Sequence, residues 1–91
     1  MTLRRHLHEL LTHEPRSVSS LARELGLRRG EVEQDLQHML RSAAARGERI
    51  EVLVARCKAC GFEFGPERLA KPGRCPRCRE SRIQEAMIRV G

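Results

Sequence analysis

Leucines recur at helical spacing at the start of the chain. The spacing i, i+4, i+7 and i+8 predicts a first helix whose apolar face holds Leu3, Leu7, Leu10 and Leu11. This helix should end at the break His13-Glu14-Pro15, because proline cannot continue a helix. The chain is therefore expected to begin with one amphipathic helix.

A short helix and a longer helix should follow. Ser17 can cap the short helix, and Gly26 supplies the left-handed residue that ends it. The longer helix is expected to start near Arg28 and to stop near residues 46–47. Its apolar face consists of Val32, Leu36, Met39, Leu40 and Ala43.

After the third helix the pattern becomes extended. Residues 50–55 follow a period of two, which predicts a strand. Phe62-Glu63-Phe64 predicts another short strand, and residues 83–90 a returning one. The sequence thus predicts an α+β chain, with a three-helix domain over residues 1–55 and a small β domain over residues 56–91 directly after it.

The second and third predicted helices have the lengths and the turn of a helix-turn-helix. The order Leu-Ala-x-x-Leu-Gly-Leu over residues 21–27, with Val32 five residues later, resembles prokaryotic winged-helix repressors. A plain three-helix bundle with no nucleic-acid role is the alternative. A wing normally has two strands, but residues 47–56 suffice for only one. The return strand must therefore come from the cysteine-rich half or be absent.

The outward face of the third helix carries side chains suited to DNA. Arginine and glutamine can each make paired hydrogen bonds to base edges, and arginine also binds phosphate. Three acidic residues, Glu31, Glu33 and Asp35, would repel phosphates, although acids in a first helical turn also complement the helix macrodipole. Together with two arginines of the second half, the expected DNA contacts are Arg28, Arg29, Gln34, Gln37, Arg41, Arg79 and Arg82.

Four cysteines form two C-x2-C pairs with fourteen residues between them: Cys57, Cys60, Cys75 and Cys78. This spacing is typical of tetrahedral structural zinc sites, and we expect these four residues to bind one Zn²⁺ per chain. Iron in a rubredoxin-like site, a redox dithiol and catalytic zinc are the alternatives. Catalytic zinc is the least favoured, because four thiolates leave no position for water. The four histidines show no ligand spacing with the cysteines and are expected to be solvated.

Composition limits the other possible functions. The chain has 91 residues and only two aromatic ones, Phe62 and Phe64, so its core is small and a stabilising metal is expected. An enclosed cavity for a small-molecule substrate is not expected, which argues against an enzyme. The first residues form no apolar signal segment, and no apolar run reaches membrane-spanning length. These features predict a cytoplasmic protein, in which cysteines are more often metal ligands than disulfides.

The net charge is +6, and sixteen of the eighteen basic residues are arginine. Residues 1–55 carry nine Lys and Arg against eight Asp and Glu, and residues 56–91 carry nine against four. A basic surface of this kind favours phosphate or carboxylate partners. Codon bias is an alternative reason for arginine over lysine. Some basic residues near the cysteines can also balance the charge of the metal site, which is −2 for four thiolates and Zn²⁺.

The second half has the pattern C-x2-C-G-F-x-F…K-x-G-x-C-P-x-C. With a helix-turn-helix before it, the chain resembles a small family of predicted prokaryotic transcriptional regulators with a C-terminal zinc ribbon. That resemblance implies a cytoplasmic regulator that binds double-stranded DNA and contains structural zinc. A protein-interaction adaptor and a metal-delivery or redox role are the alternatives. A homodimer and contact with the transcription machinery remain open, as do the operator, the effector and the sign of regulation.

Overall fold

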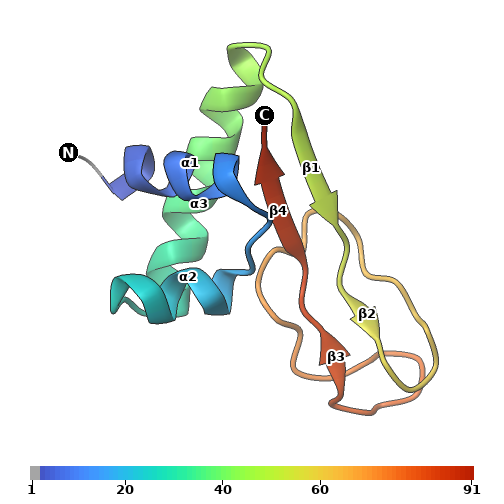
Figure 1. Cartoon of the computed structure of the whole chain (residues 1–91). Helices are drawn as coiled ribbons and strands as arrows, with labels where there is room; N and C mark the ends of the chain where they lie inside the picture. Colours follow the sequence, from blue (N-terminus) through green and yellow to red (C-terminus); the bar gives the residue numbers. More distant parts are fainter. Residues whose placement is uncertain (1–2) are drawn as a thin grey trace.

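The structure, a computed structural model, describes residues 3–91 and has the predicted α+β composition. Three helices gather at one end, and a thin ribbon of strands and loops extends from them (Figure 1). The elements are α1 (Leu3–His13), α2 (Val18–Leu25), α3 (Arg29–Ala45), β1 (Ile50–Leu53), β2 (Arg56–Cys57), β3 (Ile83–Gln84) and β4 (Met87–Val90). The molecule is elongated, with extents of 42 × 28 × 19 Å.

The short helix α2 has the two ends that its sequence predicts. Ser17 lies at the N-cap, where its hydroxyl accepts a hydrogen bond from the backbone N–H of Ser20. Gly26 ends the helix with a φ of +67°, a left-handed conformation that glycine adopts without steric cost. Leu27 follows, half-buried, and its N–H donates to the carbonyl of Ala22. The tight turn between α2 and α3 is therefore fixed by local sequence.

The longer helix α3 begins after Arg28, which lies at the N-cap without a side-chain capping bond. It ends at Ala45, and Gly47 in the following turn has a φ of +80°. The apolar face expected for this helix is the face that it buries. The core of the helical end consists of Leu7, Leu11, Val18, Leu21, Ala22, Val32, Leu36, Met39, Ala43, Leu69, Ile88 and Val90.

The two long strands pair antiparallel although 33 residues separate them in the chain. Ile50 lies opposite Val90, and Leu53 lies opposite Met87. The strand that pairs with β1 therefore comes from the cysteine-rich half, which is one of the two alternatives expected from the sequence. Residues 54–86, here called the ribbon, leave the sheet after β1 and return to it at β4 (Figure 1).

The strand β4 belongs to the helical core. Ile88 and Val90 are fully buried there, and the backbones of Arg16 and Ile88 exchange hydrogen bonds of 3.0 and 2.8 Å. Leu69, from the long loop of the ribbon, also lies in that core. Whether residues 1–55 and 56–91 behave as separate domains stays a prediction, but the packing does not divide at residue 55.

Three predicted strands have different limits in the structure. The strand expected over residues 50–55 ends at Leu53, because Ala55 turns into a second buried cluster with Phe64, Ile83 and Ala86. The strand expected at residues 62–64 is reduced to one bridge, between Arg56 and Glu63.

The return strand expected over residues 83–90 is divided into β3 and β4. These two strands pair with different partners, β2 and β1, so the chain must change direction between them. No helix within residues 3–91 combines the length and apolar character needed to cross a membrane.

Candidate functional site

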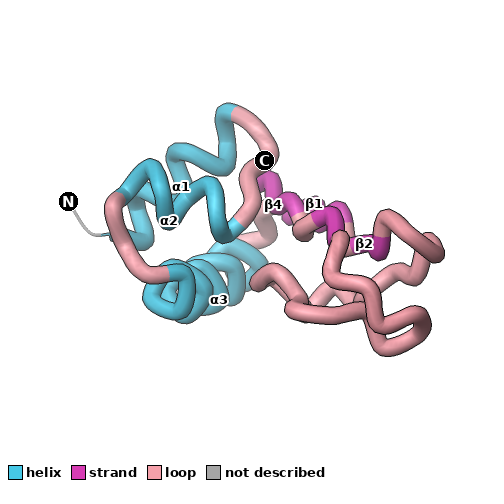
Figure 2. The backbone as a smooth tube through the Cα atoms, turned by 90° about the horizontal axis from the view of Figure 1, so that it is seen from below, coloured by secondary structure: helices cyan, strands magenta, loops and turns pink. Residues whose placement is uncertain are grey.

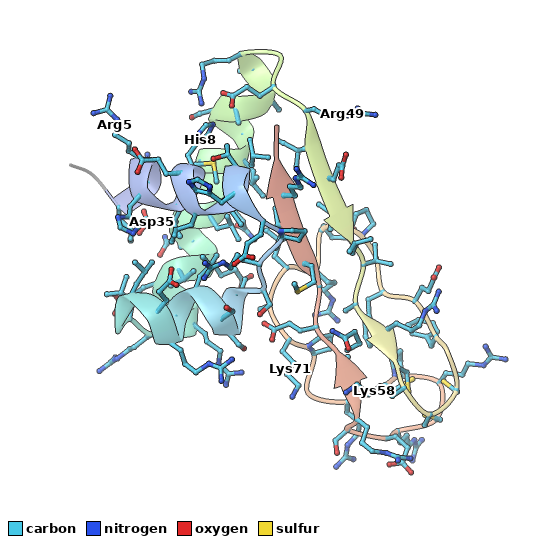
Figure 3. The ribbon with its side chains drawn as sticks, viewed as in Figure 1. Arg5, His8, Asp35, Arg49, Lys58 and Lys71 are labelled. Atoms are coloured by element: carbon cyan, nitrogen blue, oxygen red, sulfur yellow. The ribbon has the colours of Figure 1, made fainter. Side chains whose placement is uncertain are left out.

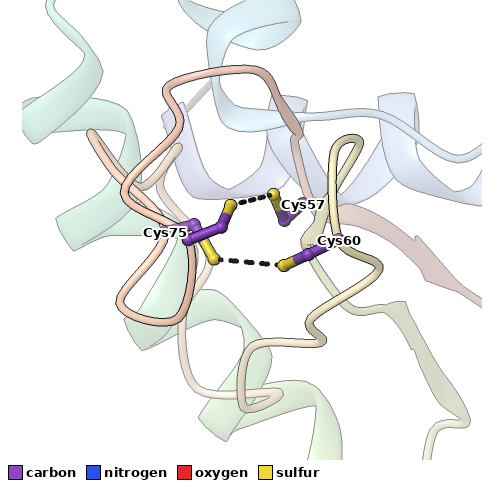
Figure 4. A group of neighbouring side chains, drawn as sticks. Cys57, Cys60 and Cys75 are labelled. Carbon is purple, nitrogen blue, oxygen red and sulfur yellow. Dashed lines mark hydrogen bonds between the residues drawn. The ribbon is translucent and has the colours of Figure 1, made fainter.

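The sulfur atoms of Cys57, Cys60, Cys75 and Cys78 all lie within 4.8 Å of one another. The Sγ atoms of Cys57 and Cys78 are 3.5 Å apart, and those of Cys60 and Cys75 are 3.6 Å apart (Figure 4). A tetrahedral zinc with Zn–S bonds of about 2.3 Å separates its sulfur ligands by about 3.8 Å. The four cysteines therefore fit one metal ion, as their spacing predicts.

Residues 57–62 form the first of two similar turns that hold these sulfurs, and we call it the first knuckle. The N–H of Cys57 donates to the carbonyl of Phe62 at 2.8 Å. The N–H of Gly61 donates to the carbonyl of Cys57 at 2.9 Å. Gly61 has a φ of +80°, which lets the chain turn sharply after the first cysteine pair. Phe62 then packs edge-on against Phe64, with ring centroids 5.1 Å apart.

Residues 75–80, the second knuckle, repeat these hydrogen bonds. The N–H of Cys75 donates to the carbonyl of Glu80 at 2.9 Å, and the N–H of Arg79 donates to the carbonyl of Cys75 at 2.8 Å. Arg79 occupies the place that Gly61 has in the first knuckle and has a φ of +64°. The N–H of Arg77 also donates to the sulfur of Cys75 at 3.4 Å. The two knuckles thus present their sulfurs to one point from opposite sides.

The pKa shifts of Cys57, Cys75 and Cys78 show why a cation suits this site. Backbone N–H groups, first that of Cys60, lower the pKa of Cys57 to about 6. Burial opposes ionisation of Cys75, but N–H donors led by that of Cys78 lower its pKa overall. The N–H of Glu80 favours the thiolate of Cys78, yet burial and the neighbouring sulfurs raise its pKa to about 12. Four thiolates can coexist here only if a metal ion compensates their charge.

The predicted DNA-contacting residues fall into two groups that the structure does not bring together. One group lies along α3 and is exposed: Arg28 at its N-cap, then Arg29, Gln34, Gln37 and Arg41. The other consists of Arg79 and Arg82, both exposed in and beside the second knuckle. Two separate surfaces are therefore available, one on a helix and one at the metal-bearing end of the ribbon.

The acidic residues of α3 are not equivalent. The Asp35 carboxylate lies 3.4 Å from the guanidinium of Arg4 on α1. Glu33 is half-buried and accepts a hydrogen bond of 3.4 Å from Gln37. Glu31 is exposed in the first turn of the helix. The repulsion of phosphate expected from three acids is therefore reduced for Asp35, whose charge is paired.

The long loop of the ribbon lies beside the C-terminal half of α3, which no local pattern predicts. Leu69 is buried there, and Pro66 and Glu67 line a shallow groove with Gln37 and Arg41. Seen from below, α3 and the loops of the ribbon run along the same side of the molecule (Figure 2). The exposed surface around Gln37 and Arg41 is therefore shared between the helix and the ribbon.

Two of the four histidines differ from expectation, because His6 and His8 are both half-buried. His8 on α1 is half-buried and bonds to the carboxylate of Glu48, in the turn after α3 (Figure 3). The hydrogen bond from His8, followed by one from Arg46, lowers the pKa of Glu48. The pairing was not predictable, because 40 residues separate the partners. His13 and His38 are exposed as expected.

A three-helix unit joined by a two-stranded sheet to a four-cysteine ribbon defines a small α+β protein with a candidate metal centre. A family model described as PF0610-like, N-terminal, matches residues 2–50, which is more than half of the chain. The chain therefore belongs to the PF0610-like family.

A solved structure gives the same assignment over nearly the whole chain. The solution NMR structure of protein PF0610 from Pyrococcus furiosus is 32% identical in sequence and superposes with a TM-score of 0.80. The match covers 97% of this chain and 87% of that one. No curated protein matches the chain.

Proposed function

We propose that this protein is a cytoplasmic transcriptional regulator that binds double-stranded DNA through a winged helix-turn-helix and contains one structural zinc. The observation that carries the proposal is the exposed outer face of α3, which follows a short capped helix and the left-handed turn at Gly26. In helix-turn-helix proteins the second helix of the pair lies in the major groove. The similarity to PF0610 supports the fold that this proposal uses.

The N-terminal half of α3 supplies the base contacts in this proposal. Arg29 and Gln34 are exposed there, and both types of side chain can make paired hydrogen bonds to base edges. Arg28 lies beside them at the helix N-cap, in a position suited to phosphate. The charge of Asp35 opposes binding less than its position suggests, because the guanidinium of Arg4 lies 3.4 Å from its carboxylate.

The strands β1 and β4 supply the two strands of a wing. A wing hairpin normally closes with a short loop, whereas here the 33 residues of the ribbon stand between the strands. The ribbon carries eight Lys and Arg and four Glu. A basic extension at the tip of the wing is suited to the phosphates next to the segment bound by α3.

Zinc is the metal that we propose for the four sulfurs. Its role is to hold the ribbon folded, since a segment with so small an apolar cluster has little else to stabilise it. Four thiolates complete a tetrahedral shell, so the proposal includes no catalysis and no small-molecule substrate. Iron is the competing ion, and elemental analysis of the purified protein distinguishes the two.

Substitutions on α3 test the proposal. On a preferred duplex selected from a random pool, Arg29→Ala and Gln34→Ala should each weaken binding by about 1–3 kcal/mol and relax specificity at one base pair. Arg49→Ala is the matched control, because Arg49 is exposed and follows the C-terminal end of α3, whereas Arg29 and Gln34 lie in its N-terminal half (Figure 3). Equal affinity of both α3 variants and the wild type would show that α3 does not contact bases.

A protein-interaction adaptor is the second candidate, and one surface favours it. The groove between α3 and the ribbon loop includes apolar side chains, Leu40, Val52, Pro66 and Leu69. Leu53, next to Val52 on β1, is 65% exposed; because side chains alternate along a strand, it faces away from the groove as a second apolar contact. A partner retained from a lysate after nuclease treatment, and lost with Leu53→Ser, would support the adaptor over the regulator.

A further inference from the structure

Arg79 has a backbone conformation that arginine rarely adopts. Within residues 3–91 it is the one non-glycine residue with a positive φ, +64°. In this region the Cβ atom of an L-residue crowds the following carbonyl, which disfavours every side chain except that of glycine. The equivalent residue of the first knuckle is Gly61, with the same hydrogen bond to the first cysteine of its pair. Glycine would therefore serve this turn with less strain.

Intramolecular contacts do not account for the arginine. The side chain is exposed, and nothing in the described part of the chain bonds to its guanidinium or pairs with it. Some other cations of the molecule differ, since Arg16, Arg46 and Arg56 each pair with a glutamate. A strained residue whose side chain points into solvent is a candidate for a contact with another molecule.

Other cations lie around Arg79 at the end of the ribbon. The N–H of Lys58 donates to the carbonyl of Arg82 at 2.9 Å. This hydrogen bond places Lys58, in the first knuckle, beside Arg82, which follows the second knuckle. Arg77 lies in the second knuckle itself. All three are exposed and, within residues 3–91, have no carboxylate partner. Lys58 lies at the far end of the ribbon from the helices (Figure 3).

Glu80 is the one acidic residue in residues 74–82, a stretch that also holds four arginines. The metal site adds a charge of about −2 once four thiolates bind Zn²⁺. The exposed cations Lys58, Arg77, Arg79 and Arg82, which lie on and beside the two knuckles, still leave a positive surface. Closely spaced phosphates of a nucleic-acid backbone fit such a surface, because guanidinium groups bind phosphate oxygens in pairs.

We propose that Lys58, Arg77, Arg79 and Arg82, here called the knuckle tip, bind the phosphate backbone of DNA beside the segment that α3 contacts. The strained conformation of Arg79 is retained because its side chain makes one of these contacts. This inference rests on the proposed DNA-binding function and deepens it, because it names the ribbon residues that contact phosphate and gives a reason for the strained conformation of one of them, Arg79. The metal ion acts here only by fixing the two knuckles that carry these cations.

The substitution Arg79→Gly tests the proposal, because stability and binding should change in opposite directions. In the zinc-loaded full chain, Arg79→Gly relieves the strained φ, so the thermal midpoint should stay equal or rise. Affinity for a mixed-sequence DNA duplex should fall several-fold, and the slope of log affinity against log salt should become shallower by about 0.9, the value of one phosphate contact. Arg79→Lys should keep the slope of the wild type. Arg49→Ala, which removes a cation at the opposite end, should also leave it unchanged.

Three results would overturn the inference. If Arg79→Gly binds DNA with the affinity and salt slope of the wild type, the knuckle tip does not contact phosphate, and the proposed function is unaffected. If Arg79→Gly lowers the thermal midpoint and the zinc content together, Arg79 balances the charge of the metal site instead. If the wild type itself shows no salt-sensitive DNA binding, the proposed function fails, and this inference fails with it.

Discussion

At the scale of single residues, the four cysteines are the part of the site that the sequence predicts most directly. Each C-x2-C pair is a local turn, so its spacing alone places two sulfurs together. It was also predictable that the two pairs lie together, because two C-x2-C pairs at this separation typically bind a single metal ion. The strain at Arg79 could have been inferred by comparing the two pairs, since glycine follows one and arginine the other. The pairing of His8 with Glu48 could not, because nothing local relates them.

Loss of one ligand should unfold the ribbon. For Cys75→Ser we expect zinc content to fall below one per chain, since a hydroxyl is a much weaker ligand than a thiolate. The NMR signals of residues 56–84 should then collapse toward unfolded positions. Ala59→Ser is the matched control, because it adds a hydroxyl to an exposed position of the first knuckle without removing a ligand. Full zinc content and an unchanged ribbon in Cys75→Ser would contradict the assignment of this ligand.

At the scale of elements, the helices were predictable, whereas the limits and partners of the strands were not. Helix α2 depends on its own cap, its own apolar face and its own terminal glycine, all within ten residues. The limits of β3 and β4 instead depend on β2 and β1, which lie far away in the sequence. A continuous extended pattern over residues 83–90 does not show that its two halves have different partners. Non-local pairing, and not strand propensity, decided this part of the fold.

The bend between β3 and β4 also stabilises α2. Glu85 lies in that bend, and its carboxylate accepts a hydrogen bond of 3.0 Å from the N–H of Ser19, in the first turn of α2. A carboxylate at a helix N-terminus satisfies a free N–H and complements the macrodipole. The contact connects the ribbon directly to the helical end of the molecule.

We expect Glu85→Ala to lower the free energy of unfolding by about 1 kcal/mol, the usual contribution of a capping contact. Denaturation by urea, followed by circular dichroism, measures this change. Glu80→Ala removes an exposed carboxylate from the same half of the chain and should have a smaller effect. Equal stability of the two variants would show that the Glu85 contact does not stabilise α2.

At the scale of the whole molecule, the helices share one core with β4 and with Leu69 of the ribbon. The sequence predicted a boundary near residue 55 because the hydrophobic period changes there. It could not show that the last strand returns to the helices, since the apolar residues of β4 fit either half. The metal site lies outside this shared core, with its own small cluster around Phe64.

Removal of the metal ion from the four cysteines should therefore affect the two parts differently. Chelation should unfold the knuckles and leave most of the helical circular dichroism, because the helices bury their own apolar faces. The thermal midpoint of the helices should nevertheless fall, since Leu69 and Glu85 then lose their fixed positions. If chelation abolishes the helical signal completely, the ribbon and helices form one cooperative unit and the helical half is not stable by itself.

The affinity of the zinc-loaded protein for duplex DNA, measured over a range of salt concentrations, tests the proposed function most directly. The exposed cations of α3 and the knuckle tip should release counterions, so log affinity should fall linearly with log salt, with a slope of about −0.9 for each phosphate contacted. Two surfaces in contact with DNA predict a slope equivalent to several contacts. If no duplex from a random pool shows salt-sensitive binding even at low ionic strength, the protein is not a DNA-binding regulator, and its basic ribbon is better explained as a surface for an acidic protein partner.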